Sequence, residues 1–304
     1  MKGRLCVETV PYIGEIFALA APFCWSCAVL LFRRTGEVVP PLALNLFKNL
    51  LATVLFWATF LALGRHGLPD AGPGERLLLV ASGAIGIGIS DTFFFMTLNR
   101  VGAGLQAIIN TSYSPSIILL SVLFLGERLG PVQVVGVVLI LGAVLSVTRM
   151  RGSGGTVALS RRTLALGVTF GILCTTTQAV SIVMIKPLLE RSPLIWANCW
   201  RMLGGVAMSV ILLRWLPHTG LATLRDVRIW PVMIPGALLG TYVSLVFWLA
   251  GMKYTQASTA SALNQTATLW TFVLAAILLR EPVTWKRLLG LAGGVCGVAL
   301  VTFG

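Results

Sequence analysis

Asp91 is the one acidic residue near the middle of a long apolar segment of this sequence. Loss of surrounding water favours the protonated form of a carboxylic acid, so an acid in this position is a candidate for proton coupling or cation binding. The alternative is a structural residue in a locally wet place, paired with Arg100 or with a neighbouring hydroxyl group. The hypothesis is that Asp91 is a coupling residue, and the partners of its carboxylate in a structure bear on it first.

Two asparagines lie among hydroxyl and amide side chains in two other apolar segments. Such groups either line a polar cavity or join helices through hydrogen bonds, which contribute roughly 0.6 kcal/mol each on average. Pro115 favours a polar cavity. A proline in a helix frees backbone carbonyl groups, and membrane proteins tolerate such groups where they line a cavity. The candidate substrate-binding residues of these two segments are Asn110, Tyr113, Ser114, Asn264, Gln265 and Thr268.

Aromatic and polar side chains in further segments suit a small amphipathic molecule, because a ring covers its apolar part and adaptable polar groups bind the rest. These candidates are Trp25, Ser26, Thr176, Gln178 and Trp248.

Two cations lie early in apolar segments. A cation that faces a cavity can bind a carboxylate or a phosphate. Lys48 can instead extend to the lipid headgroups. Arg201 lies deeper in its segment, and we predict that it is paired or faces the cavity as a substrate-binding residue.

The composition is that of a membrane protein. Hydrophobic residues make up 57% of the 304 residues and charged residues 11%, whereas soluble domains have about 25% charged residues. A helix needs about 20 mostly apolar residues to cross a bilayer. The sequence therefore predicts an all-α integral membrane protein with ten transmembrane helices. The predicted helices are residues 12–32, 40–63, 76–98, 104–125, 131–148, 163–186, 194–214, 230–251, 257–279 and 284–303.

The formal net charge of +13 is carried almost entirely between the apolar segments or at their ends. This distribution suits lipid headgroups and leaves no basic region for nucleic acid. With both termini in the cytoplasm, 8 cations would lie inside and 13 outside, the reverse of the usual excess in cytoplasmic loops. The orientation stays open. The six cysteines and two histidines form no ligand set, so no metal, cofactor or disulfide is expected.

An internal repeat divides the chain. A shift of 154 positions lays the second half over residues 82–148 without a gap and places Asn110 on Asn264 and Glu127 on Glu281. The sequence predicts five-helix repeats at residues 1–150 and 163–304, joined by a basic Gly/Ser linker at 151–162. An odd number of crossings in each repeat makes the two halves inverted in the membrane.

Two smaller features have structural interpretations. Glu127 and Glu281 are expected to accept hydrogen bonds from the free amides that open the fifth helix of each repeat. Glycines spaced by four, such as Gly293 and Gly297, let helices approach closely, either inside the chain or at a dimer face.

The sequence resembles the EamA family of the drug/metabolite transporter superfamily over nearly its whole length. The resemblance rests on the two five-helix repeats and on a pattern that both halves share. A small-polar helix with an asparagine is followed by Gly-Glu-Arg-Leu at 126–129 or Arg-Glu-Pro-Val at 280–283, and then by a glycine-rich helix. Trp25-Ser26 and Arg201 resemble further positions of the family pattern, whereas Lys48 departs from it.

The resemblance implies a secondary transporter of a bacterial inner (plasma) membrane that exports amino acids, drugs or other small amphipathic metabolites by alternating access. One alternative is an exchanger of phosphorylated or nucleotide-linked sugars, which needs several cations in its cavity. Another is a non-transporting sensor or lipid-carrier partner. The helices carry no catalytic set and no nucleotide-binding motif, so no enzyme activity is expected. The expected partners are a small-molecule substrate and membrane lipids, with the chain as a monomer or homodimer.

Overall fold

The apolar segments form helices in the structure, a computed structural model, because a helix satisfies its backbone hydrogen-bonding groups internally. The structure describes residues 12–63, 72–113, 115–116, 119–120, 123, 130–149, 160–185, 187–188, 192–215, 220–254 and 263–303. Regular elements in these ranges are all helices. They are α1 (Ile13–Thr35), α2 (Pro41–Ala62), α3 (Pro73–Gly83), η2 (Ala84–Ile89), α4 (Ser90–Asn110), α6 (Pro131–Arg149), α7 (Arg161–Val183), α9 (Leu194–Trp215), η3 (Leu221–Arg225), η4 (Val227–Ile229), α10 (Trp230–Ala237), η5 (Leu238–Val243), α11 (Ser244–Tyr254), α13 (Thr266–Leu278) and α14 (Trp285–Phe303).

Six helical stretches of the described residues are long and apolar enough to cross a membrane. The longest, Pro73–Asn110, has 38 residues, more than the roughly 20 that one crossing needs. Gly102 interrupts it with φ 81° and ψ 175°, a backbone conformation that glycine tolerates and other residues rarely adopt. The interruption lies between the predicted helices 76–98 and 104–125. The full count of ten crossings remains a prediction.

Two short π-helices occur at matching places of the two halves. The segment η2 begins at Ala84 and η5 begins at Leu238, so the two differ by the same 154 positions that align the repeats. A π-helix has a wider turn than an α-helix, and such turns are frequent at functional sites. Neither π-helix was predicted from the sequence.

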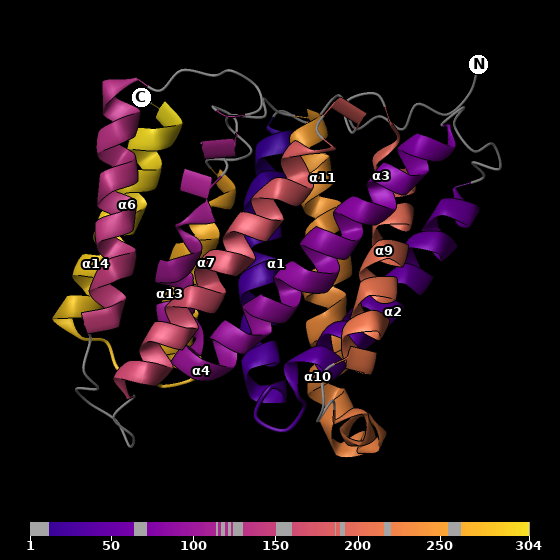
Figure 1. Cartoon of the computed structure of the whole chain (residues 1–304), viewed down its shortest axis with the longest axis horizontal. Coiled ribbons are helices and arrows are strands. Elements are labelled where there is room, and N and C mark those ends of the chain that lie inside the picture. The colour runs from indigo at the N-terminus through magenta and orange to yellow at the C-terminus, as the bar shows by residue number, and fades with distance from the viewer. Residues whose placement is uncertain are drawn as a thin grey trace.

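Each π-helix packs against helices from the other half of the chain. The first, η2, contacts α7 and α9, whereas η5 contacts α1 and α2. The crossing of α3 and α9 is very close, because a Cβ added to Gly83 would lie 1.8 Å from the carbonyl oxygen of Arg201. The two halves therefore share one interior (Figure 1).

The glycines of α14 pack within the chain. A Cβ at Gly297 would lie 2.8 Å from the carbonyl oxygen of Gly136 in α6, and one at Gly293 would lie 3.7 Å from Ala143 Cβ. The two helices lie side by side at one edge of the bundle (Figure 1). The glycine spacing in α14 thus serves a close contact with α6 inside the chain.

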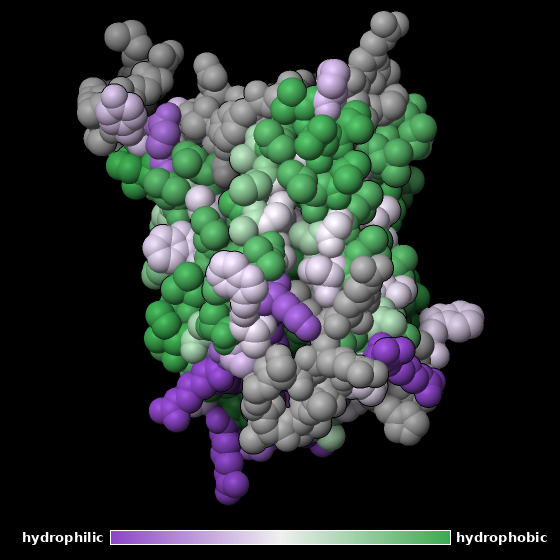
Figure 2. Space-filling view, turned by 90° about the vertical axis from the view of Figure 1, so that its left-hand side faces the viewer, coloured by the Kyte–Doolittle hydropathy of each residue, from purple (hydrophilic) through white to green (hydrophobic). Residues whose placement is uncertain are grey.

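The outer face of this edge is largely hydrophobic, and hydrophilic side chains gather toward one end (Figure 2). Two arginines in the last turn of α1 donate hydrogen bonds to other helices. Arg33 donates to the carbonyl oxygen of Asn99 at 3.2 Å, and Arg34 donates to that of Leu278 at 3.4 Å. An apolar wall with charges at its end is the pattern of a protein surrounded by lipid.

Candidate functional site

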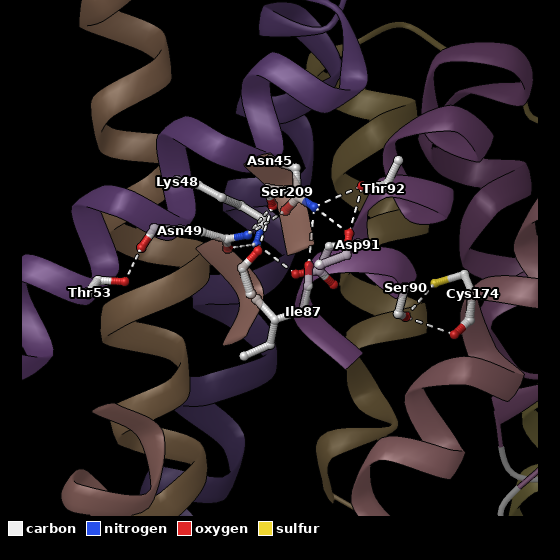
Figure 3. A network of polar contacts seen from close by, with 12 residues as sticks. Asn45, Lys48, Asn49, Thr53, Ile87, Ser90, Asp91, Thr92, Cys174 and Ser209 are labelled. Carbon is white, nitrogen blue, oxygen red and sulfur yellow. Dashed lines mark hydrogen bonds and ion pairs between the residues drawn. The ribbon is translucent and has the colours of Figure 1, made fainter. Parts of the chain in front are cut away.

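An ion pair between a buried lysine and a partly buried aspartate joins α2 to α4. Lys48 Nζ lies 2.6 Å from Asp91 Oδ2, and the two side chains are 2% and 18% exposed (Figure 3). Lys48 therefore does not extend to the lipid headgroups. Asp91 does not pair with Arg100, which donates to the carbonyl oxygen of Met96 and lies over the ring of Phe170. The predicted extension of Lys48 to the headgroups and the predicted pairing of Asp91 with Arg100 are therefore wrong.

Amide side chains hold Lys48 in place. Lys48 Nζ donates to Asn49 Oδ1 at 2.8 Å. Asn49 Nδ2 in turn donates to Asn45 Oδ1 at 3.1 Å and to Ser209 Oγ of α9 at 3.3 Å. Asn45, Lys48 and Asn49 lie on one face of α2 because positions three and four apart are neighbours on a helix. This network therefore ties α2 to both halves of the chain (Figure 3).

The network ends on the first π-helix. Asn45 Nδ2 donates to the carbonyl oxygens of Ile87 and Gly88 at 3.1 and 2.8 Å, and to Thr92 Oγ1 at 3.0 Å. A widened turn leaves carbonyl groups without ideal helical partners, and Asn45 supplies a donor for two of them. The position of Asp91, two residues after the end of η2, is thus fixed by α2.

Arg201 lies beside this network in α9. Its Nη2 donates to Ser181 Oγ of α7 at 3.3 Å, and Tyr113 and Asp91 are close enough to interact with it electrostatically. Arg201 is 8% exposed, and its Nε has no hydrogen-bond partner among the described residues. Three residues predicted from the sequence, Asp91, Tyr113 and Arg201, therefore lie in one neighbourhood.

A second polar contact joins α1 to α13. Ser26 Oγ shares its one proton between the carbonyl oxygens of Pro22 and Ala267, at 2.7 and 3.1 Å, and accepts from Thr271 Oγ1 at 3.0 Å. Thr268 on the same helix is also buried. These bonds give Ser26 an interhelical structural role, whatever its part in substrate binding.

Other predicted residues flank this interior. The ring of Trp25 lies 5.4 Å from that of Phe94, and Thr176 Oγ1 lies 3.4 Å from Ser116 Oγ. The remaining candidates that the structure describes, all partly buried, are Asn110, Gln178, Trp248, Asn264 and Gln265. Ser114 lies outside the described residues.

The paired asparagines mark places where helices are interrupted. Asn110 is the last residue of α4 and is followed by a turn, and Asn264 lies just before the turn at Gln265 that precedes α13. Interrupted helices expose backbone groups, which membrane proteins tolerate where protein or a cavity covers them. The helix interruptions next to Asn110 and Asn264 therefore favour a cavity near both asparagines.

Sequence reasoning missed Asn45, Thr92, Ser181 and Ser209. The signal for Asn45 was present, since a buried lysine needs polar neighbours one turn away on its own helix. Ser181 and Ser209 carry no such signal, because serines on apolar helices more often bond to their own backbone. Among the described residues no group of three metal-binding side chains occurs.

Long apolar helices that surround an ion pair place this chain in the class of polytopic membrane proteins with a polar interior. More specifically, the chain belongs to the EamA-like transporter family, whose sequence profile matches residues 12–149 and 165–303. It is 22% identical over 279 residues to a protein of Archaeoglobus fulgidus named as an uncharacterized transporter, a match that covers 91% of this chain and 93% of the relative. A protein of known crystal structure has a similar fold, with a TM-score of 0.65, 18% identity and coverage of 94% of this chain and 95% of that chain. The chain is a multi-pass integral membrane transporter.

Proposed function

We propose that this protein is a secondary transporter that moves amino acids or other small amphipathic metabolites out across a bacterial inner membrane by alternating access. The observation that carries the proposal is the Lys48–Asp91 ion pair, which lies next to a π-helix and connects through amides to α9. Ionisable residues inside a membrane span are expensive and usually mark a transport pathway.

Asp91 is the proposed coupling group. Protonation of its carboxylate removes the negative charge that holds Lys48, and deprotonation restores the pair. The ammonium group of Lys48 keeps Asn49 as a partner at 2.8 Å in either case. Lys48 would therefore keep a polar partner if Asp91 were protonated, which limits the cost of leaving a buried ammonium group unpaired.

Two inverted five-helix halves supply the proposed conformational change. The matching π-helices and their reciprocal packing on α7 and α9, and on α1 and α2, support a pseudo-twofold arrangement. Rocking of such halves about a shared site is a common mechanism of secondary transport. The sequence has no nucleotide-binding motif, so the energy is proposed to come from an ion gradient.

Uptake into proteoliposomes tests the proposal. Labelled amino acids are offered with and without an imposed pH gradient to the wild type, to Asp91→Asn and to the control Glu37→Gln, which removes an exposed acid outside the network. The expected result is accumulation that follows the gradient in the wild type and the control and is lost in Asp91→Asn. Gradient-driven transport that survives Asp91→Asn would exclude Asp91 as the coupling group.

A further inference from the structure

Among the described residues, the polar interior around Asp91 carries more positive than negative charge. Lys48 and Arg201 are 2% and 8% exposed, and Asp91 is the described acid that interacts with both. Because arginine stays protonated in proteins and Lys48 already holds Asp91 at 2.6 Å, one positive charge is left over.

The surplus charge belongs to Arg201. Among the described residues, the ion pairs within 4.0 Å are Lys48–Asp91 and Arg287–Glu281, so Arg201 has no carboxylate at that distance. Its one hydrogen bond to a described residue, to Ser181 Oγ, is long at 3.3 Å, and its Nε has no partner. A guanidinium has five N–H donors in a planar fork, which a single serine does not satisfy.

The asymmetry of the repeats accounts for this surplus. Lys48 and Arg201 lie early in the second helix of their repeats, and Asp91 follows the π-helix of the first repeat. The shift of 154 positions places Leu245, an apolar residue, where the second repeat would need the matching acid. The first repeat therefore carries its own counter-ion and the second does not.

We infer that Arg201 binds a carboxylate group of the transported substrate, an assignment that rests on the proposed transport function. A planar carboxylate matches the planar guanidinium, and its single negative charge balances the single surplus charge of Lys48, Asp91 and Arg201. A phosphate monoester, with up to two negative charges, would exceed that balance while Lys48 remains bound to Asp91. The inference thus favours substrates that carry a carboxylate group over sugar phosphates.

Ligand-induced stabilisation of the full-length protein in lipid nanodiscs tests the inference, because a ligand raises Tm when it binds the folded state. The probes are matched pairs, hexanoate with hexanamide and L-leucine with L-leucinamide, together with hexyl phosphate. The expected result is that the acids raise Tm of the wild type and the amides do not. Arg201→Gln should weaken acid binding by about 10- to 100-fold.

The control is Arg100→Gln, which removes another arginine of the bundle whose partners are Met96 and Phe170. It should bind the acids like the wild type. Any one of four results would overturn the inference. Acids and amides could stabilise the protein equally, hexyl phosphate could stabilise it more than hexanoate, neither acid could stabilise it, or Arg201→Gln could bind the acids as the wild type does.

Stability without ligand gives an independent readout. A surplus buried charge without a counter-ion does not stabilise the fold, so Arg201→Met should have the same Tm as the wild type or a higher one. A fall in Tm as large as that of Lys48→Met would make Arg201 a structural residue and would also overturn the assignment. Carboxylate binding without transport in proteoliposomes would contradict the proposed function but not the binding of carboxylates by Arg201. Transport restricted to neutral or cationic molecules would contradict carboxylate binding by Arg201 but not the proposed transport.

Discussion

Glu281 caps a helix that lies 178 positions earlier in the chain: its Oε1 accepts a hydrogen bond of 2.7 Å from the backbone amide of Ala103. Its Oε2 accepts from the amide of Gly104 at 3.0 Å and lies 3.5 Å from Arg287 Nη1. These amides open the helical run that follows the break at Gly102, where no earlier carbonyl is available to them. One carboxylate from the second half thus fixes the start of a helix in the first.

Glu281→Gln should lower the stability of the protein. A glutamine keeps one oxygen for one amide but turns its NH2 group toward the other amide, and it loses the charge that faces Arg287. The expected loss is about 1–2 kcal/mol, measured as unfolding in detergent micelles by circular dichroism. The exposed Glu37→Gln is the matched control and should leave the unfolding midpoint unchanged. Equal midpoints for both variants would show that the cap contributes nothing.

Gly102→Ala should destabilise the same junction. The backbone of Gly102 has φ 81° and ψ 175°, and a Cβ there would lie 2.6 Å from Glu281 Oε1. The strained conformation alone costs of order 1–3 kcal/mol, and the displaced carboxylate adds the loss of the cap. Gly142→Ala in α6 is the control, because no atom lies within 4 Å of its added Cβ. Stability that is unchanged in Gly102→Ala would contradict the backbone geometry.

Helix positions were predictable because apolar length is a property of adjacent residues. Residues 12–32 and 40–63 correspond to α1 (Ile13–Thr35) and α2 (Pro41–Ala62), and 194–214 corresponds to α9 (Leu194–Trp215). Membership of a helical membrane transporter family followed from the same patterns and is confirmed by the family match.

The partners of polar residues were not predictable because they depend on helix rotation and packing. Asp91 pairs with Lys48, 43 positions away on another helix, and the sequence does not show which faces of the two helices meet. Glu281 was expected to cap the helix that follows it in the chain, since most caps are local. It caps a helix of the other half instead, so that expectation was wrong. The expectation for Glu127 lies outside the described residues.

Lys48 and Asp91 should show strong thermodynamic coupling. Lys48→Met removes the counter-ion that lies 2.6 Å from the partly buried Asp91 carboxylate, which costs up to about 3–5 kcal/mol. Lys48→Met combined with Asp91→Leu removes both charges and should recover most of that loss, since Leu245 already occupies the equivalent place of the second repeat. The four proteins of this cycle are compared by denaturant unfolding. Additive effects of the two substitutions would show that the ion pair is not energetically coupled.

Gly83→Ala should disrupt the crossing of α3 and α9 and, through it, the position of Arg201. A Cβ at Gly83 would lie 1.8 Å from the carbonyl oxygen of Arg201 and 2.7 Å from its Cα. Backbone atoms cannot rotate away as a side chain can, so α9 must move, and overpacking of this kind costs about 1–3 kcal/mol or more. Gly74→Ala in the same helix is the matched control, because nothing lies within 4 Å of its added Cβ.

The two variants separate packing from helix propensity. Both replace glycine by alanine in α3, a change that favours a helix by up to about 1 kcal/mol where there is room, so Gly74→Ala should be neutral or stabilising. Gly83→Ala should lower the yield of monodisperse protein in size-exclusion chromatography and lower Tm, and the protein that does fold should bind carboxylates more weakly. A Gly83→Ala protein with wild-type Tm and wild-type carboxylate binding would mean that α3 and α9 do not cross as closely as the structure shows.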